Sequence, residues 1–203
     1  MRIQTYSLGE LQANCYLLEH EGKAVLIDPA DDASFLLEKI QRSCLELVGL
    51  FATHGHFDHV MAVGEIQMSF TVPFYIHKND RFLIERLEST AEHFLGHKQI
   101  IIPPINIEYI SAKKLQVASF KLQMIETPGH TPGGVCFYFP DEAAIFTGDT
   151  LFAGAIGRTD LSYSNKKDLW SSLSSILALP DETTIYPGHG ESSYIGQEKS
   201  ILQ

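Results

Sequence analysis

The densest group of potential metal-binding side chains in this chain lies in one short stretch, "FATHGHFDHVMAVGE" (residues 51–65). Three histidines and an aspartate occupy six consecutive positions there, directly after a short apolar run. Imidazole and carboxylate groups suit zinc, iron or manganese. A hydrogen-bonded polar turn would also explain such a cluster, so the rest of the sequence has to distinguish the two. The four residues are His54, His56, Asp58 and His59.

Three further segments have the same form, because each is an apolar run that enters a glycine-rich turn carrying one potential ligand. They are "IETPGHTPGG", "AIFTGDTLF" and "TIYPGHG". Loops at strand ends are where a rigid scaffold holds functional side chains, and glycine allows the backbone to pass close to a bound group. Each turn therefore adds one residue to the candidate metal site. These residues are His130, Asp149 and His189.

The seven candidate ligands comprise five histidines, two aspartates and no cysteine. A structural zinc site would more often use four ligands rich in cysteine. Seven donors are too many for one tetrahedral ion, but they suffice for two ions that share a carboxylate and keep positions open to water. The donor set therefore predicts two divalent metal ions in a catalytic site. We expect zinc, and iron or manganese would suit the same donors.

Strand patterns and helical patterns follow one another along the chain, with a similar element order in its two halves. A hairpin turn is expected at Glu21-Gly22, and residues 96–114 give no clear pattern. This order favours two sheets with helices outside them, in four layers. The expected strands are 3–8, 14–30, 45–53, 72–77, 115–126, 134–139, 143–147 and 183–187, and the expected helices are 34–44, 60–70, 79–95, 166–179 and a short final one.

Size and charge limit the classes of function. A chain of 203 residues fits one domain, and we expect residues 1–203 to form it. Fifteen Lys and Arg against 25 Asp and Glu give a net charge of −10 without any basic run, which disfavours binding to DNA or RNA. The expected partner is a small-molecule substrate, and the composition says nothing about the oligomeric state.

The cysteines and the chain start bear on the cellular compartment. Cys15, Cys44 and Cys136 are odd in number, widely spaced and in apolar surroundings, so we expect buried thiols and a reducing compartment. The first residues lack a continuous apolar stretch, and no 18-residue apolar run follows anywhere. The sequence therefore predicts a cytoplasmic protein without a membrane span.

"THGHFDH" resembles the T-H-x-H-x-D-H signature of the metallo-β-lactamase superfamily, and the later histidine, aspartate and histidine follow in that family's order. The resemblance implies an α+β fold, an αββα four-layer sandwich of two mixed β-sheets with helices on the outer faces. It also implies a division of the ligands between two metals. The first metal would be held by His54, His56 and His130 and the second by Asp58, His59 and His189, with Asp149 bridging them.

The segment "FTGDTLFAGAIGRTDL" resembles the hydroxyacylglutathione hydrolases, or glyoxalase II enzymes, in their short form. Fourteen residues follow His189, so the C-terminal helical extension that grips glutathione in the longer form is not expected. The resemblance implies metal-bridging hydroxide attack on a glutathione thioester such as S-D-lactoylglutathione. Asp58 would orient the hydroxide and shuttle its proton. Arg158 would contact the substrate, or else pair with Asp160.

Several alternatives stay open. The segment "GRTDL" is shared with the persulfide dioxygenases, which use one iron and molecular oxygen, and a catalytically silent metal-binding module is a third hypothesis. β-Lactamases and tRNA-processing nucleases are disfavoured by the aspartate at 149 and by the negative charge. Asp149 could instead cap a turn, and Asp28 could either accept a hydrogen bond from a ligating imidazole or form an Asx turn. The pattern leaves open whether residues 79–114 form a lid. Four histidines lie outside the candidate site, namely His20, His77, His93 and His97.

Overall fold

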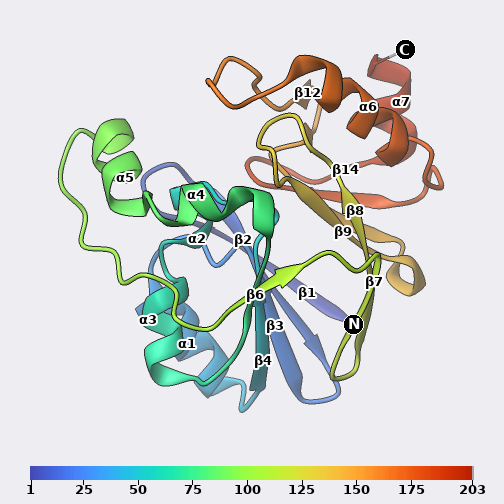
Figure 1. Ribbon diagram of the computed structural model, residues 1–203. Coiled ribbons are helices and arrows are strands. Elements are labelled where there is room, and N and C mark those ends of the chain that lie inside the picture. Colours follow the sequence, from blue (N-terminus) through green and yellow to red (C-terminus); the bar gives the residue numbers. More distant parts are fainter. Residues whose placement is uncertain (203) are drawn as a thin grey trace.

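Two six-stranded sheets face each other in the computed structural model, which describes residues 1–202 (Figure 1). The strand order is β1-β2-β3-β4-β5-β6 in the first sheet and β14-β13-β10-β9-β8-β7 in the second. Each sheet contains both parallel and antiparallel pairs, so both are mixed. Helices α1 and α3 cover the outer side of the first sheet, and α6 and α7 cover that of the second (Figure 1). The predicted αββα sandwich is confirmed.

The first sheet and its helices account for residues 2–110. The predicted hairpin at Glu21-Gly22 is confirmed, since His20 pairs with Lys23 and both turn residues have positive φ, 51° and 72°. The elements are β1 (Arg2–Leu8), β2 (Ala13–His20), β3 (Lys23–Ile27), α1 (Ala33–Arg42), β4 (Glu46–Phe51), α2 (Phe57–Val60), α3 (Val63–Ser69), β5 (Phe74–His77), η1 (Lys78–Asp80), α4 (Arg81–Ile84), α5 (Leu87–Leu95) and β6 (Ile107–Ile110).

Two of the expected helices are interrupted. The helix predicted for residues 60–70 is replaced by α2, which begins earlier, and by α3. The helix predicted for residues 79–95 is split into η1, α4 and α5, and Arg86 before α5 has a φ of −122°. The sequence predicts Asn79 or Asp80 as the cap of this helix. Asp80 occupies the N-cap position of α4, but its side chain makes no capping bond there, because its carboxylate accepts hydrogen bonds from Gly55, Thr131 and Gly133 elsewhere in the fold.

The second sheet and its helices account for residues 114–202. The strand predicted for residues 115–126 is a hairpin, since Ala118 has a φ of 52° and turns the chain between β7 and β8. Short strands β11, β12 and β14 had no signal in the sequence. The elements are β7 (Lys114–Val117), β8 (Phe120–Glu126), β9 (Val135–Phe139), η2 (Pro140–Glu142), β10 (Ala144–Gly148), β11 (Leu151–Phe152), β12 (Ala155–Ile156), α6 (Lys166–Ile176), β13 (Thr184–Pro187), β14 (Ser193–Tyr194) and α7 (Ile195–Leu202).

Three hydrophobic clusters hold the layers together. An aromatic cluster lies between the sheets, where Phe51 stacks edge-on against Phe137 with ring centroids 5.3 Å apart. A second cluster joins the first sheet to α1 and α3, and a third joins the second sheet to α6. The helical spacing of Leu169, Leu173, Ile176 and Leu177 predicts a stripe of core residues. The first three are fully buried in the third cluster, and Leu177 packs against it partly buried. Burial of these apolar faces fixes the two sheets against each other, and hence the strand ends that carry the site.

The burial of the three cysteines agrees only in part with the prediction from the sequence. Cys15 and Cys136 are buried free thiols, as predicted, but the prediction for Cys44 is wrong because this residue is exposed. Helix α1 ends at Arg42, and Cys44 adopts a φ of 53° in the turn that leads the chain back to β4, so its side chain faces solvent. Within residues 1–202 no helix combines the length and apolar character needed to cross a membrane.

Candidate metal centre

The candidate ligands lie at the carboxyl ends of four strands. His54 follows β4 of the first sheet, whereas His130, Asp149 and His189 follow β8, β10 and β13 of the second. Strands β10 and β13 are parallel, and β8 runs in the same direction because β9 is antiparallel to both β8 and β10. Their carboxyl ends therefore meet at one edge. Backbone bonds from Val135 to Thr53 (2.8 Å) and from Asn14 to Gly188 (2.7 Å) fasten the two sheets together there.

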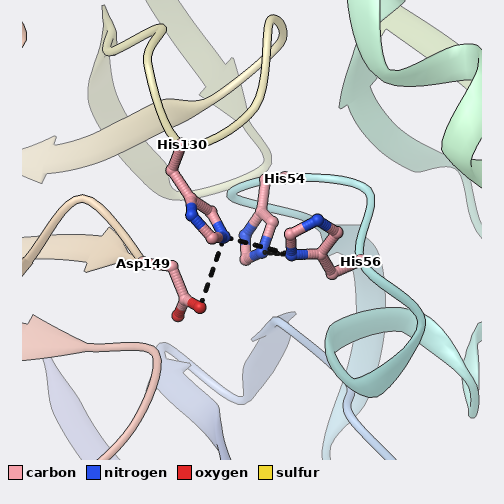
Figure 2. A group of neighbouring side chains, drawn as sticks. All are labelled: His54, His56, His130 and Asp149. Atoms are coloured by element: carbon pink, nitrogen blue, oxygen red, sulfur yellow. Dashed lines mark hydrogen bonds and ion pairs between the residues drawn. The ribbon is translucent and has the colours of Figure 1, made fainter. Parts of the chain in front are cut away.

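All seven predicted residues converge at this edge. His54, His56, His130 and Asp149 form one group, drawn in Figure 2, and Asp58, His59 and His189 form another. Within each group, one donor atom from every residue lies within 4.8 Å of the others. The Oδ2 atom of Asp149 lies 3.5 Å from Nε2 of His130, while its Oδ1 atom lies 3.4 Å from Nε2 of His59. Asp149 thus stands between the two groups, which is the position that the family resemblance implies for a bridging ligand.

Glycine is required where the ligands crowd together. A Cβ atom at Gly188 would collide with the Oδ1 atom of Asp149 and with the ring of His59. Gly148 has a φ of 49°, and a Cβ atom there would collide with the side chain of Thr53. The glycines of the "TGD" and "PGHG" turns therefore let the backbone of two strands approach the same small volume.

Each of the five histidines has one ring nitrogen bonded to the surrounding protein, and the other faces the centre. Such outer hydrogen bonds orient a metal-binding imidazole and fix which nitrogen is free. The inward atoms are Nδ1 of His56 and Nε2 of the other four rings. The outer pairs are His54 Nδ1 with Thr53 Oγ1 (3.1 Å), His56 Nε2 with Tyr163 Oη (2.8 Å), His59 Nδ1 with Asp28 Oδ2 (3.0 Å), His130 Nδ1 with the Arg158 carbonyl (3.0 Å) and His189 Nδ1 with the Gln12 carbonyl (3.3 Å).

Two buried atoms at the middle of the centre have no hydrogen-bond partner among the described residues. They are Nε2 of His59 and Oδ1 of Asp149, which face each other at 3.4 Å. Leaving a buried polar atom unpaired costs about 1–3 kcal/mol. Divalent cations bound between these donors would satisfy both atoms, and the donor set of imidazoles and carboxylates suits them. The residues present therefore fit a metal centre.

Charge and burial act differently on the individual groups. Burial, assisted by neighbouring imidazoles, lowers the pKa of His54 well below its usual value and that of His56 to about 3, so both rings are neutral and ready to bind a cation. Burial alone would lower the pKa of His59 as well, but the carboxylates of Asp58 and Asp149 raise it. Burial opposes ionisation of Asp149, yet the adjacent His59 lowers its pKa and keeps it ionised.

A cavity of about 120 Å³ adjoins the centre. It is lined by four candidate ligands (His56, Asp58, His130 and Asp149), by apolar side chains, by Thr90 and by Arg158. Arg158 makes two 2.7 Å hydrogen bonds to Asp160, which is one of the two predicted roles. It also lines the cavity, and its contact with a substrate stays a prediction. Thr90 and Phe94 come from α5, so the 79–114 segment contributes a wall of the cavity. The apolar lining residues are Leu11, Phe57, Phe94 and Leu161.

The sequence analysis did not identify three residues whose hydrogen bonds position the candidate ligands. Thr53 and Tyr163 bond the outer nitrogens of His54 and His56, and Asp80 ties the first ligand stretch to the His130 loop. For Asp28 the sequence left two interpretations open, and its carboxylate accepts hydrogen bonds from His59 and from Thr53. Of these residues, only Asp28 and Thr53 could have been recognised from the sequence, since each lies at the end of an apolar strand. His20, His77, His93 and His97 belong to neither group.

A four-layer fold with a histidine and aspartate centre at its strand ends defines the metallo-hydrolase class. The family model of the metallo-beta-lactamase superfamily matches residues 8–189, and the chain belongs to this superfamily. One curated relative is hydroxyacylglutathione hydrolase GloC of Haemophilus influenzae, which is 36% identical over 205 residues, covering 98% of this chain and 95% of the relative.

Solved structures agree with this membership. The BLEG-1 B3 metallo-beta-lactamase superposes with a TM-score of 0.91 at 34% identity, covering 98% of this chain and 97% of its own. TTHA1623 in a di-iron-bound form superposes with a TM-score of 0.90 at 37% identity, and the match covers 98% of both chains. ETHE1 from Myxococcus xanthus superposes with a TM-score of 0.79 at 28% identity, and the match covers 98% of this chain and 82% of its own. The fold is therefore shared over nearly the whole chain.

Proposed function

We propose that this protein is a metal-dependent hydrolase of glutathione thioesters, converting a substrate of the S-D-lactoylglutathione type to glutathione and a hydroxy acid. The observation that carries the proposal is the pair of donor groups joined by Asp149 and placed beside a cavity that Arg158 lines. Similarity to GloC over the full length supports the substrate class. The resemblance of "FTGDTLFAGAIGRTDL" to these hydrolases supports it as well.

The proposed centre holds two divalent ions, with His54, His56 and His130 at the first, Asp58, His59 and His189 at the second, and Asp149 between them. Bound cations would lower the pKa of a water molecule toward about 7 and polarise the thioester carbonyl. Zinc is the expected metal, and the di-iron form of TTHA1623 makes iron a direct competitor for the same donors.

Asp58 is the proposed proton carrier. Burial opposes ionisation of its carboxyl group, but His59 and the hydrogen bond with His189 lower its pKa, so the carboxylate is ionised. It also lines the cavity, with Oδ2 placed 3.3 Å from Nε2 of His189. A carboxylate in this position would accept the proton that the attacking water loses and return it to the departing sulfur. A thiolate is a good leaving group, so this general-acid assistance can be weak.

The cavity walls would bind the rest of the substrate. Leu11, Phe57 and Phe94 present apolar surface that excludes water from the reacting carbonyl, and Phe57 stacks on Phe94 with ring centroids 6.1 Å apart. Arg158 would pair with a carboxylate of glutathione. Its existing bond to Asp160 is at the surface, where ion pairs contribute little to stability, so exchange for a substrate carboxylate costs little.

Two other activities are the alternatives to exclude. The segment "GRTDL" favours a glutathione persulfide dioxygenase with a single iron, and likeness to BLEG-1 favours β-lactam hydrolysis. A catalytically silent metal-binding module is the remaining reading. The enzymatic alternatives would use the same pocket, so substrate and metal content distinguish them, and the silent module would turn over no substrate.

The test is a parallel assay on protein whose metal content has been measured. Loss of the thioester chromophore of S-D-lactoylglutathione, with about two metals per chain, is the expected result. Oxygen uptake with glutathione persulfide and one iron would support the dioxygenase, and opening of a chromogenic cephalosporin would support the lactamase. Metal-loaded protein inactive on all three would overturn the proposal. Chelated protein serves as the control for metal dependence.

A further inference from the structure

The five outer partners of the candidate ligands are not equivalent. Carbonyl oxygens hold His130 and His189, and the Asp28 carboxylate holds His59. These oxygens only accept, so each ring must present its N–H outward. Thr53 behaves in the same way, because its hydroxyl donates to Oδ2 of Asp28 at 2.7 Å and can only accept from His54. Four of the five rings are thus held by oxygens that can only accept the outer N–H.

His56 is the exception. Its outer nitrogen, Nε2, bonds to the phenol oxygen of Tyr163 at 2.8 Å, the shortest of the five outer bonds. Among the described residues, no other group bonds this nitrogen. His56 also differs in turning Nδ1 inward, where it lies 3.0 Å from Nε2 of His54 and 3.1 Å from Nε2 of His130. Rotation of an imidazole about its χ2 bond is soft, so a bond at the outer nitrogen is what fixes this orientation.

Tyr163 is itself held in place. Its ring packs edge-on against Phe82, with centroids 5.3 Å apart, and it is about half buried. The next two residues are tied to the His130 loop, since Ser164 donates to the carbonyl of His130 at 2.7 Å and Asn165 donates to that of Gly129 at 2.8 Å. The phenol therefore approaches His56 from a segment that is anchored on the same loop as the third histidine of the group.

We propose that Tyr163 is a positioning residue for His56, which it holds with Nδ1 toward the group formed with His54, His130 and Asp149. A phenol both donates and accepts, so it can hold the ring in either tautomer, and once Nδ1 binds a cation the Nε2–H donates to Oη. The inference rests on the metal centre of the proposed function and not on its thioester substrate. Loss of the phenol oxygen should weaken one metal site and leave the other intact.

The experiment compares Tyr163→Phe, which removes only that oxygen, with Tyr109→Phe, a change at an exposed tyrosine on β6. Metal dissociation constants are measured by chelator competition, and the visible spectrum of the cobalt-loaded protein is recorded. In Tyr163→Phe one of the two metals should bind about 10- to 100-fold more weakly. Only part of the cobalt spectrum should change, and the Tm of the metal-free protein should match the wild type. Tyr109→Phe should keep both metals at wild-type affinity.

The outcomes separate this inference from the proposed function. Wild type with two metals and Tyr163→Phe with unchanged affinities would overturn the role of Tyr163 alone. An equal weakening of both metals together with a lower metal-free Tm would also overturn it, because the tyrosine would then support the fold and not one ligand. Wild type that binds no metal would overturn the proposed centre and this inference with it.

Discussion

The Oδ2 atom of Asp28 lies 3.0 Å from the Nδ1 atom of His59, with both side chains fully buried. The same carboxylate accepts the backbone N–H and the hydroxyl of Thr53, each at 2.7 Å. Thr53 in turn contacts His54. Asp28, directly after β3, has a φ of 49°, a conformation that costs free energy for a residue other than glycine. Its carboxylate orients the imidazole of His59 directly and that of His54 through Thr53.

Asp28→Asn should weaken metal binding while preserving the fold. The amide has the shape of the carboxylate, but its NH2 group only donates, so one of the two positions that accept hydrogen bonds from His59 and Thr53 becomes a donor. We expect an affinity about 10- to 100-fold lower, measured by chelator competition. Asp141→Asn, at an exposed residue of η2, is the control. Unchanged affinity in Asp28→Asn would show that the carboxylate does not support His59 as a ligand.

Asp149→Ala should abolish thioester hydrolysis, to the rate of the chelated protein. Asp149 lies between the two donor groups and is the proposed bridging ligand, so its loss would remove a donor from each metal at once. His56→Ala should have the same effect through the first group alone. The circular dichroism spectrum should stay that of the wild type, because the centre joins loops at the strand ends and the hydrophobic clusters lie elsewhere. Near-normal turnover in either variant would contradict the site.

The strand ends and the candidate donors beside them could be predicted from the sequence because both depend on local signals. An apolar run followed by a glycine turn can be recognised in the amino-acid sequence, and so can the Glu21-Gly22 hairpin. Asp80 and Tyr163 were missed because their roles depend on partners that are 25 and 107 residues away along the chain. The same long-range bonds of Asp80 occupy the carboxylate that could have capped the helix predicted for residues 79–95. Periodicity reports the faces of an element and carries no information about such partners.

Asp80→Ala should destabilise the metal-free protein by about 3–5 kcal/mol. The carboxylate is fully buried and accepts from Gly55 at 2.9 Å, from Thr131 at 2.8 Å and from Gly133 at 2.6 Å. The variant leaves three buried donors unpaired. Urea unfolding measures the loss, and Asp32→Ala is a useful comparison, since removing this exposed cap of α1 should cost only about 1 kcal/mol. Similar losses of unfolding free energy in both variants would show that the buried hydrogen bonds of Asp80 do not stabilise the fold.

Thiol labelling should distinguish Cys44 from the other two cysteines. Cys44 is exposed, whereas Cys15 and Cys136 are buried, and burial raises the pKa of the Cys136 thiol to about 12. The thiolate is the reactive form, so a thiol reagent should modify one cysteine rapidly in the native protein and three after denaturation. Cys44→Ser should remove the rapid phase. Rapid labelling of two or three native thiols would contradict the packing around β2 and β9.

Metal retention should fall as the pH is lowered, and His59 gives the reason. In the metal-free centre the carboxylates of Asp58, Asp149 and Asp28 outweigh the effect of burial and raise the pKa of His59 above its usual value. The His59 ring therefore binds a proton at neutral pH in the metal-free centre. A cation binds only to the neutral ring, so a proton and a metal ion compete for the same nitrogen atom. Metal per chain at a fixed chelator concentration should drop as the pH is lowered, and adding metal at neutral pH should release protons. His97→Gln, at an exposed histidine paired with Glu10, should leave both results unchanged. Metal uptake without proton release, at an affinity independent of pH, would mean that His59 is not a ligand.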